Sequence, residues 1–249
     1  MNKVNKVNKD YLIALIIAII ITIVVSQPLF YSDDLCFHSD TPEGTMSDTP
    51  EGAMDCVDPV LSWDMEQIPG ENIADGEENT GIKFVNIRTV KGRTGKGAYF
   101  NGIDSYIQTA YQVQGWKNFA ISFWVRPEKL MKDDQLAVIM DNGHSAKNNF
   151  AFQTADFSGQ KWVWHCNGTD IVFSLPLKEW SRVFIMVDTE KKQIIGYLND
   201  IKVGEINLTQ TPIFGSKPLV FGKLSSSPSR FYRGTIDNVK LWKNPLNKS

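Results

Sequence analysis

The fold is decided by Phe119-Ala-Ile-Ser-Phe-Trp-Val-Arg-Pro127, a stretch in which apolar residues recur at every second position. In an extended chain the odd positions from Phe119 to Val125 point to one face, and Trp124 points to the other. Aromatic and β-branched residues favour strands, and Pro127 ends the segment because proline cannot donate to a sheet ladder. We therefore predict a β-strand with one side in the core.

Runs of the same kind continue along the chain, and no window after Leu61 has the spacing of an amphipathic helix. They are residues 136–141, 149–154, 161–166, 170–174, 182–188, 193–198, 202–208, 219–221 and 232–242. Asn199-Asp200 joins two of them with residues that tolerate positive φ, which predicts a tight hairpin. The pattern predicts an antiparallel sandwich or barrel. The expected core residues are Phe119, Ile121, Phe123, Val125, Val183, Ile185, Val239 and Leu241.

Five blocks of this sequence, taken in order, are fairly specific for one kind of fold. They are Leu61-Ser-Trp-Asp-Met-Glu66, Gly95-Lys-Gly-Ala-Tyr-Phe-Asn-Gly-Ile-Asp-Ser-Tyr-Ile107, Phe119–Pro127, Ile195-Gly-Tyr-Leu-Asn-Asp-Ile-Lys-Val-Gly204 and Arg233-Gly-Thr-Ile-Asp-Asn-Val-Lys-Leu-Trp242. They resemble the laminin-G-like jelly rolls of the concanavalin A-like lectin/glucanase superfamily, although Asp200 stands where glycine is usual. The resemblance implies an all-β, antiparallel jelly-roll β-sandwich over residues 58–249. It implies no single function, because such folds bind glycans, bind proteins or hydrolyse polysaccharides.

The N-terminus combines a short charged stretch, residues 1–10, with an uncharged apolar segment, residues 11–30. As a helix, this segment would cross a bilayer core of about 30 Å. Lysines precede it and Asp33-Asp34 follows it, so the positive-inside rule places residues 1–10 in the cytoplasm and the remainder outside. We predict a transmembrane signal anchor. Cleavage of a signal peptide near Ser26 also fits, and it too would export the domain.

Residues 31–57 contain the tandem octapeptide Ser39-Asp-Thr-Pro-Glu-Gly-Thr-Met46 and Ser47-Asp-Thr-Pro-Glu-Gly-Ala-Met54. Its Pro, Gly and acidic residues predict an extended, flexible linker. Cys36 and Cys56 bracket the repeat, where a disulfide would close a loop in an oxidising compartment. Cys166 lies in a strand with two tryptophans and is expected to be a buried free thiol.

Two classes of function are disfavoured. The net charge is −2 and the folded region has no dense basic run, which argues against a nucleic-acid partner. Glycosidases on this fold need two nearby carboxylates, for which a Glu-x-Asp-x-Glu pattern would be typical, and the sequence has none. His38, His144 and His165 are scattered and suggest no catalytic triad or His-x-x-x-His metal motif. We therefore predict that the protein is not an enzyme.

The family resemblance also implies a structural Ca²⁺ between the first and last strands. Asp237 shares the parity of Val239 and Leu241, so its carboxylate is expected on the core face, where it needs a partner. Glu66 and Asp75 match acidic positions of the family and would complete a set of oxygen ligands. A turn-capping Asp237 that accepts backbone N–H groups fits equally well.

Candidate ligand-binding residues gather in a polar loop, residues 141–149, and on one strand. They are Trp124, Asp141, Asn142, His144, Asn148 and Asn149. The loop's amides and carboxylate suit sugar hydroxyls, and Asp141 with Asn142 would chelate Ca²⁺ at a rim. Trp124 would stack on a sugar ring. A plain polar turn and a packing role for Trp124 explain the same residues.

These features together predict a noncatalytic binding or adhesion module, held at a membrane by residues 11–30 and displayed outside. A glycan is the expected ligand class. The second hypothesis is a structural or assembly protein that binds a surface protein, and the third is a polysaccharide-cleaving enzyme. Exposed aromatics beside polar groups would favour a glycan, and an apolar patch at a sheet edge would favour a protein.

Overall fold

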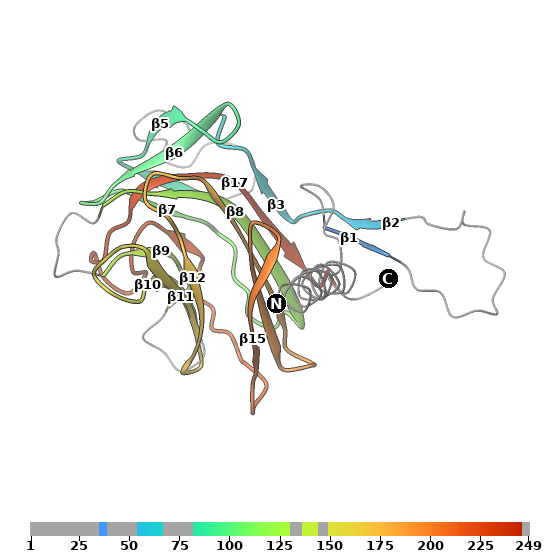
Figure 1. The fold of residues 1–249 in the computed structure, drawn as a ribbon. Helices are drawn as coiled ribbons and strands as arrows, with labels where there is room; N and C mark the ends of the chain where they lie inside the picture. The colour runs from blue at the N-terminus through green and yellow to red at the C-terminus, as the bar shows by residue number, and fades with distance from the viewer. Residues whose placement is uncertain (1–34, 39–53, 67–81, 130–135, 144–148, 246–249) are drawn as a thin grey trace, which may run out of the picture. The chain divides into compact units, whose positions relative to one another are not determined.

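The computed structural model describes residues 35–38, 54–66, 82–129, 136–143 and 149–245 (Figure 1). The chain divides into two compact units, Met1–Cys56 and Val57–Ser249. In the N-terminal part, β1 (Leu35–His38) and β2 (Met54–Val57) form a two-stranded sheet. Cys36 lies in β1 and Cys56 in β2, but their side chains lie outside what is described, so their disulfide stays a prediction.

The predicted anchor, residues 11–30, and the octapeptide repeat up to Ala53 also lie outside the described residues. Among the residues that are described, none forms an apolar helix of membrane-spanning length.

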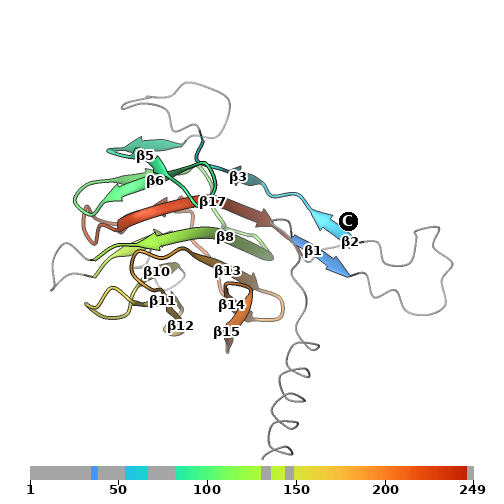
Figure 2. The same ribbon diagram turned by 45° about the horizontal axis from the view of Figure 1, so that its top comes forward.

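The second unit consists of two antiparallel sheets. The seven-stranded sheet has the order β12 (Thr169–Ser174), β11 (Lys161–Cys166), β10 (Phe150–Thr154), β9 (Val138–Asp141), β16 (Val220–Phe221), β7 (Tyr106–Gln108) and β4 (Lys83–Val85). The eight-stranded sheet has the order β15 (Ile201–Asn207), β14 (Gln193–Leu198), β13 (Ser181–Asp188), β8 (Asn118–Pro127), β17 (Arg233–Lys243), β6 (Lys96–Asn101) and β5 (Arg88–Lys91), with β3 (Leu61–Trp63) also paired to β17. Figure 2 shows the closing strand β17 between β8 and β6. The described part of this unit contains no helix, which confirms the predicted all-β sandwich.

The core lies between the inner faces of the two sheets. All eight predicted core residues are at most 1% exposed, so the face assignments from alternation are confirmed. Aromatic rings fill the centre, and the Phe150 and Trp164 rings stack with centroids 4.3 Å apart. Cys166 is a buried free thiol, as predicted, and burial raises the pKa of its thiol to about 12. The thiol is therefore protonated and unreactive at neutral pH.

The strand boundaries follow the sequence pattern closely. Each predicted run after Pro127 contains a strand, with ends that differ by at most two residues. The hairpin between β14 and β15 is also confirmed, because Asn199 and Asp200 have φ of 49° and 65°. Strands β4 and β5 were not predicted. They are short, and most of their side chains are exposed or half-buried, so they carry little apolar alternation.

One prediction about β17 is wrong. Asp237 was expected on the core face with Val239 and Leu241, but the pairing with β8 shifts register between Asp237 and Lys240. Ile236 and Val239 both belong to the core cluster although they are three residues apart. Asn238 lies between them with φ of 47°, as in a β-bulge. Asp237 follows Ile236 directly and therefore lies on the opposite, outer side of the sheet.

Candidate functional site

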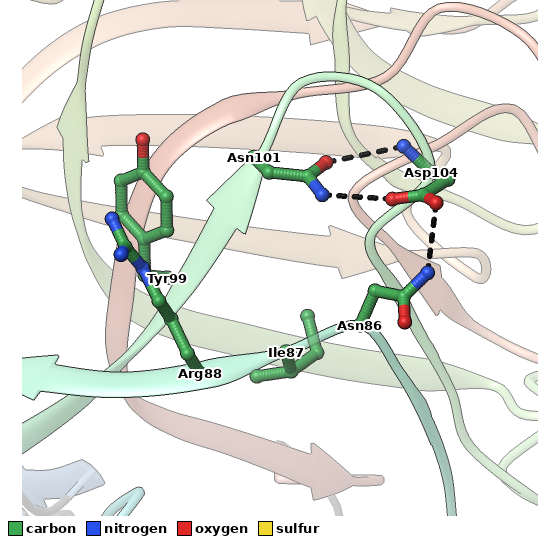
Figure 3. A pocket seen from close by; sticks show the side chains of 6 residues that line it. All are labelled: Asn86, Ile87, Arg88, Tyr99, Asn101 and Asp104. Carbon is green, nitrogen blue, oxygen red and sulfur yellow. Dashed lines mark hydrogen bonds between the residues drawn. The ribbon is translucent and has the colours of Figure 1, made fainter. Parts of the chain in front are cut away.

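A polar groove of about 570 Å³ opens at the edge of the eight-stranded sheet. It lies where the chain passes between the sheets, at the β4–β5 link and the β6–β7 turn. Its lining residues are Asn86, Ile87, Arg88, Tyr99, Asn101 and Asp104. In Figure 3, Arg88 and Tyr99 stand on one side of the groove and the three polar residues Asn86, Asn101 and Asp104 on the other.

Asn101 organises the turn that forms one wall. Its Oδ1 accepts hydrogen bonds from the backbone N–H groups of Ile103, Asp104 and Ser105 at 2.8, 3.1 and 3.2 Å. Ser105 Oγ ties this turn to the β4–β5 link by donating to the Asn86 carbonyl at 2.6 Å. The chain following β6 therefore holds a defined conformation without a ligand, which lowers the entropy lost on binding.

Asp104 is the acidic group of the groove. Asn101 Nδ2 donates to its Oδ1 at 2.7 Å, and Asn86 Nδ2 donates to its Oδ2 at 2.8 Å (Figure 3). A carboxylate oxygen has two lone pairs, so each oxygen retains one acceptor site. Asp104 is exposed, and these sites are open to hydroxyl groups.

Arg88 supplies donors on the opposite side. Its Cζ lies 4.3 Å from the centroid of the Tyr99 ring, a cation–π distance. Within the residues that the structure describes, the Arg88 guanidinium makes no hydrogen bond or ion pair, so its N–H groups are open to a ligand. The Tyr99 hydroxyl donates to Glu128 Oε2 at 3.3 Å, which fixes the ring. The groove thus places donors beside a half-buried aromatic ring on one side and carboxylate acceptors on the other.

The predicted calcium residues Glu66 and Asp237 converge on one feature, the turn between β5 and β6. Asp237 Oδ2 accepts the N–H groups of Arg93 and Thr94 at 2.7 and 3.2 Å, and Glu66 Oε1 accepts the N–H of Lys96 at 2.8 Å. Burial raises the pKa of Asp237, its bonds to the backbone lower it, and the Glu66 carboxylate raises it further. Like charges therefore meet here, while Asp75 lies outside the described residues.

The glycines of this turn leave room for the two carboxylates and, at Gly92, for the Lys96 carbonyl. A Cβ on Gly95, which has φ of 54°, would stand 1.7 Å from Glu66 Oε1, and one on Gly92 would stand 2.6 Å from Asp237 Oδ2. The described residues contain no group of three acidic, histidine or cysteine side chains arranged for a metal. The turn-capping role of Asp237 is visible, and calcium binding there stays a prediction.

The predicted ligand loop is largely internal where it is described. Asp141 and Asn142 are 0% exposed and Asn149 is 5% exposed. Asp141 Oδ1 and Oδ2 accept the N–H groups of Gly143 and Ser225 at 3.1 and 2.6 Å, and Asn142 Oδ1 accepts that of Phe150 at 2.7 Å. These three side chains hold loops together. His144 and Asn148 lie outside the described residues.

Trp124 is half-buried on the outer face of β8, beneath Arg93, whose Cζ lies 4.8 Å from its ring. Asp141 belongs to the other sheet, so the structure does not bring Trp124 and the 141–149 loop together. The groove residues were not identified from the sequence. The available signal was Asn101-Gly-Ile-Asp104, a turn between two strands within a recognised block, but Asn86 reaches it only through the sheet topology.

The fold of the second unit is similar to the folds of several solved structures. The binding domain of Paraclostridial Mosquitocidal Protein 1 has a TM-score of 0.56 and 20% identity, covering 76% of this chain and 50% of that chain. The receptor binding domain of botulinum neurotoxin type G has a TM-score of 0.55 and 15% identity, covering 77% and 49%. This chain thus spans about half the length of these two toxin domains.

A third similar structure is domain 4 of AbnA, a GH43 extracellular arabinanase from Geobacillus stearothermophilus, solved in complex with arabinotriose. It has a TM-score of 0.51 and 18% identity, and the match covers 64% of this chain and 75% of that chain. At these identities the likeness shows a shared fold.

No curated protein sequence matches the chain. A family model, however, matches residues 101–249, more than half of the sequence. The chain therefore belongs to the concanavalin A-like lectin/glucanases superfamily.

Proposed function

We propose that this protein is a noncatalytic glycan-binding module displayed outside a membrane, with the Asn86–Asp104 groove as its binding site. The proposal rests on the arrangement of the groove, in which the Arg88 donors and Tyr99 face the Asp104 acceptors (Figure 3). Sugar hydroxyls both donate and accept hydrogen bonds, and they match such paired groups. Specific small-molecule sites combine a few fixed polar groups with aromatic surface.

The number of carboxylates in the groove supports a noncatalytic role. Of its six lining residues, Asp104 is the single carboxylate. Hydrolysis of a glycosidic bond by this type of fold requires two, one as acid and one as base or nucleophile. Asp104 is also fixed between two amides, which suits a recognition role.

The roles of structurally similar proteins support the same class of function. Two of them are binding domains of toxins, and AbnA domain 4 was solved with arabinotriose bound. Transfer of these roles to the present chain is part of the proposal, since fold alone does not fix function.

Binding to a glycan array tests the proposal. Residues 57–249 should bind at least one glycan, and Asp104→Ala should weaken that binding about tenfold or more, because a charge-assisted hydrogen bond contributes about 1.5–3 kcal/mol. Glu179→Ala is the matched control, since Glu179 is exposed and lies outside the groove. Equal binding by the parent and Asp104→Ala would show that the groove is not the site.

The membrane anchor is a separate part of the proposal. The uncharged segment 11–30 and its flanking charges support a retained span with the domain outside. Carbonate extraction of the expressed protein should leave the full chain in the membrane pellet. Release of the domain into the soluble fraction would instead indicate cleavage of a signal peptide.

One observation favours the second candidate, a module that binds a protein. Strand β15 lies at the edge of its sheet, and its side chains Ile201 and Val203 are 69% and 38% exposed. An edge strand with exposed apolar residues can add a strand from a partner. Ile201→Lys should abolish binding to such a partner and leave glycan binding by the groove unchanged.

A further inference from the structure

Four arginines from separate parts of the sequence share the outer face of the eight-stranded sheet. Strand pairing arranges them in two adjoining rows. The first row is Arg88, Tyr99, Thr235 and Arg126, and the second is Arg182, Trp124 and Asp237. Arg93, in the turn after β5, lies over Trp124 in the second row. Paired residues of neighbouring strands project on the same side of a sheet, so these side chains form one surface.

The direction of this surface follows from the buried residues between its members. Ala98 and Phe100 flank Tyr99, Phe123 and Val125 flank Trp124, and all four are 0% exposed in the core. Successive strand residues point to opposite faces. Tyr99 and Trp124 therefore point away from the core, and the arginines around them do so too.

Two of the arginines are held in place by aromatic rings. Arg88 Cζ lies 4.3 Å from the centroid of Tyr99, and Arg93 Cζ lies 4.8 Å from that of Trp124. Arg126 is fixed in another way, because its Nε donates to the Lys178 carbonyl at 2.9 Å. Side chains that are ordered before binding lose less entropy when a ligand arrives.

The charge of this surface is poorly neutralised. Arg182 pairs with Asp200 at 3.1 Å, but Arg88, Arg93 and Arg126 form no ion pair within the part of the chain that is described. Asp237 lies among them, yet it is buried and accepts backbone N–H groups through both oxygens. Adjacent strands are about 5 Å apart, so Arg88 and Arg126, at the two ends of the first row, are separated by roughly 15 Å along the sheet, and Arg93 lies over the adjoining row. Such a cluster attracts anions.

We propose that this arginine surface, defined by Arg88, Arg93 and Arg126, binds the acidic groups of a polysaccharide whose hydroxyls occupy the adjoining groove. The ligand class is then a carboxylated or sulfated glycan. The planar guanidinium matches the two oxygens of a carboxylate or sulfate. Arg88 and Tyr99 belong to both the groove and the surface, which makes the two continuous (Figure 3). This inference rests on the proposed glycan-binding function.

The surface suits a polysaccharide better than a nucleic acid. Binding of single strands relies on open aromatic faces on which bases stack. Here arginines already cover one face of Tyr99 and of Trp124. The chain as a whole also carries a net charge of −2, without the general positive field of nucleic-acid-binding domains.

Calorimetric titration of the full chain, kept in a sugar-free nonionic detergent, tests the inference with matched ligands. The pairs are a galacturonate oligomer with its methyl ester, and a sulfated oligomer with its desulfated form; a single-stranded DNA is the third probe. In at least one pair the acidic member should bind about tenfold or more tightly, and added salt should reduce that preference. The double variant Arg93→Gln/Arg126→Gln should abolish the preference for the acidic ligand. Placing Lys instead of Gln at position 93 of that variant should restore part of the preference.

The control variant Lys83→Gln/Lys161→Gln removes the same charge from exposed positions on the other sheet and should keep the preference. Equal affinity for acidic and neutral members would overturn the inference while the proposed function stands. No binding of any glycan would instead contradict the proposed function. Tighter binding of DNA than of every glycan, lost in the arginine variant, would assign the surface to nucleic acid and also overturn the inference.

Discussion

Two groups of Asp and Asn residues in this domain have the same composition and opposite positions. Asp141, Asn142 and Asn149 are buried beside β9 and β10. Asn86, Asn101 and Asp104 line an open groove at the edge of the other sheet. In the first group, hereafter the internal triad, the side-chain oxygens accept hydrogen bonds from backbone N–H groups of several loops. In the second, the groove triad, Asp104 is bonded mainly by the amides of its neighbours and faces solvent.

The difference teaches that loop composition alone does not identify a binding site. The internal triad is covered because Ser225 and Gly215 come from other loops to meet Asp141 and Asn149. Nothing in the local sequence of residues 141–149 indicates this covering. A polar loop becomes a site when the fold leaves its acceptors open, as at Asp104, and a scaffold when the fold brings backbone donors to it.

The largest expected effect separates the two groups by stability. Asp141→Ala should lower the free energy of unfolding by about 2–4 kcal/mol, because the N–H groups of Gly143 and Ser225 would lose their acceptor in a buried place. Urea denaturation of residues 57–249 measures the change. An unchanged midpoint would mean that Asp141 is not part of the scaffold.

A smaller loss of stability is expected at Asn149, a neutral member of the internal triad. Asn149 Nδ2 donates to the Gly143 carbonyl at 2.7 Å, and its Oδ1 accepts the N–H of Gly215 at 3.2 Å. Asn149→Ala should cost about 1–3 kcal/mol, since both groups lose a neutral partner. The same urea titration, run beside Asp141→Ala, should rank the two variants in this order. The reverse order would show that the charge of Asp141 contributes little.

The sequence predicted what depends on regular alternation and missed what depends on long-range topology. Ile121 and Phe123 flank the polar Ser122 within one strand, so their common inward face followed from strand geometry alone. The bulge at Asn238 was missed because Asp237 was given the parity of Val239 and Leu241, although the three-residue step from Ile236 to Val239 breaks the alternation. The groove was missed because Asn86 and Asp104 lie on separate chain segments that meet only when the two sheets are joined.

The third prediction concerns calcium binding by Glu66 and Asp237, which are together less buried than the internal triad and more buried than Asp104. Glu66 is half-buried, Asp237 is fully buried, and both carboxylates approach the β5–β6 turn. The pKa of Asp237 is raised by burial and by Glu66, so a cation between them would relieve both effects. We propose a weak site there. With dissociation constants of about 0.1–1 mM, 2 mM CaCl₂ would stabilise the fold by about 0.6–1.8 kcal/mol.

Thermal unfolding with 2 mM CaCl₂ against EDTA measures this increment. Asp237→Asn should abolish it while keeping the size of the side chain, and Asp170→Asn on the other sheet should keep it. A midpoint that does not respond to calcium in the parent would leave Asp237 with the role of capping the turn through Arg93 and Thr94.

The smallest expected effect on stability belongs to the groove triad. Asp104 is exposed, and its partners Asn86 and Asn101 would bond to water if the carboxylate were removed. Exposed polar interactions contribute little, so Asp104→Ala should change the free energy of unfolding by less than about 0.5 kcal/mol. The turn itself should persist, because Asn101 Oδ1 accepts the backbone N–H groups of Ile103 and Ser105, and these bonds do not involve the Asp104 carboxylate. Urea denaturation beside the glycan-binding assay gives both readouts on one sample. A stable variant that no longer binds would separate recognition from folding at this residue, whereas a loss of stability like that of Asp141→Ala would place Asp104 in the scaffold and remove the contrast between the two triads.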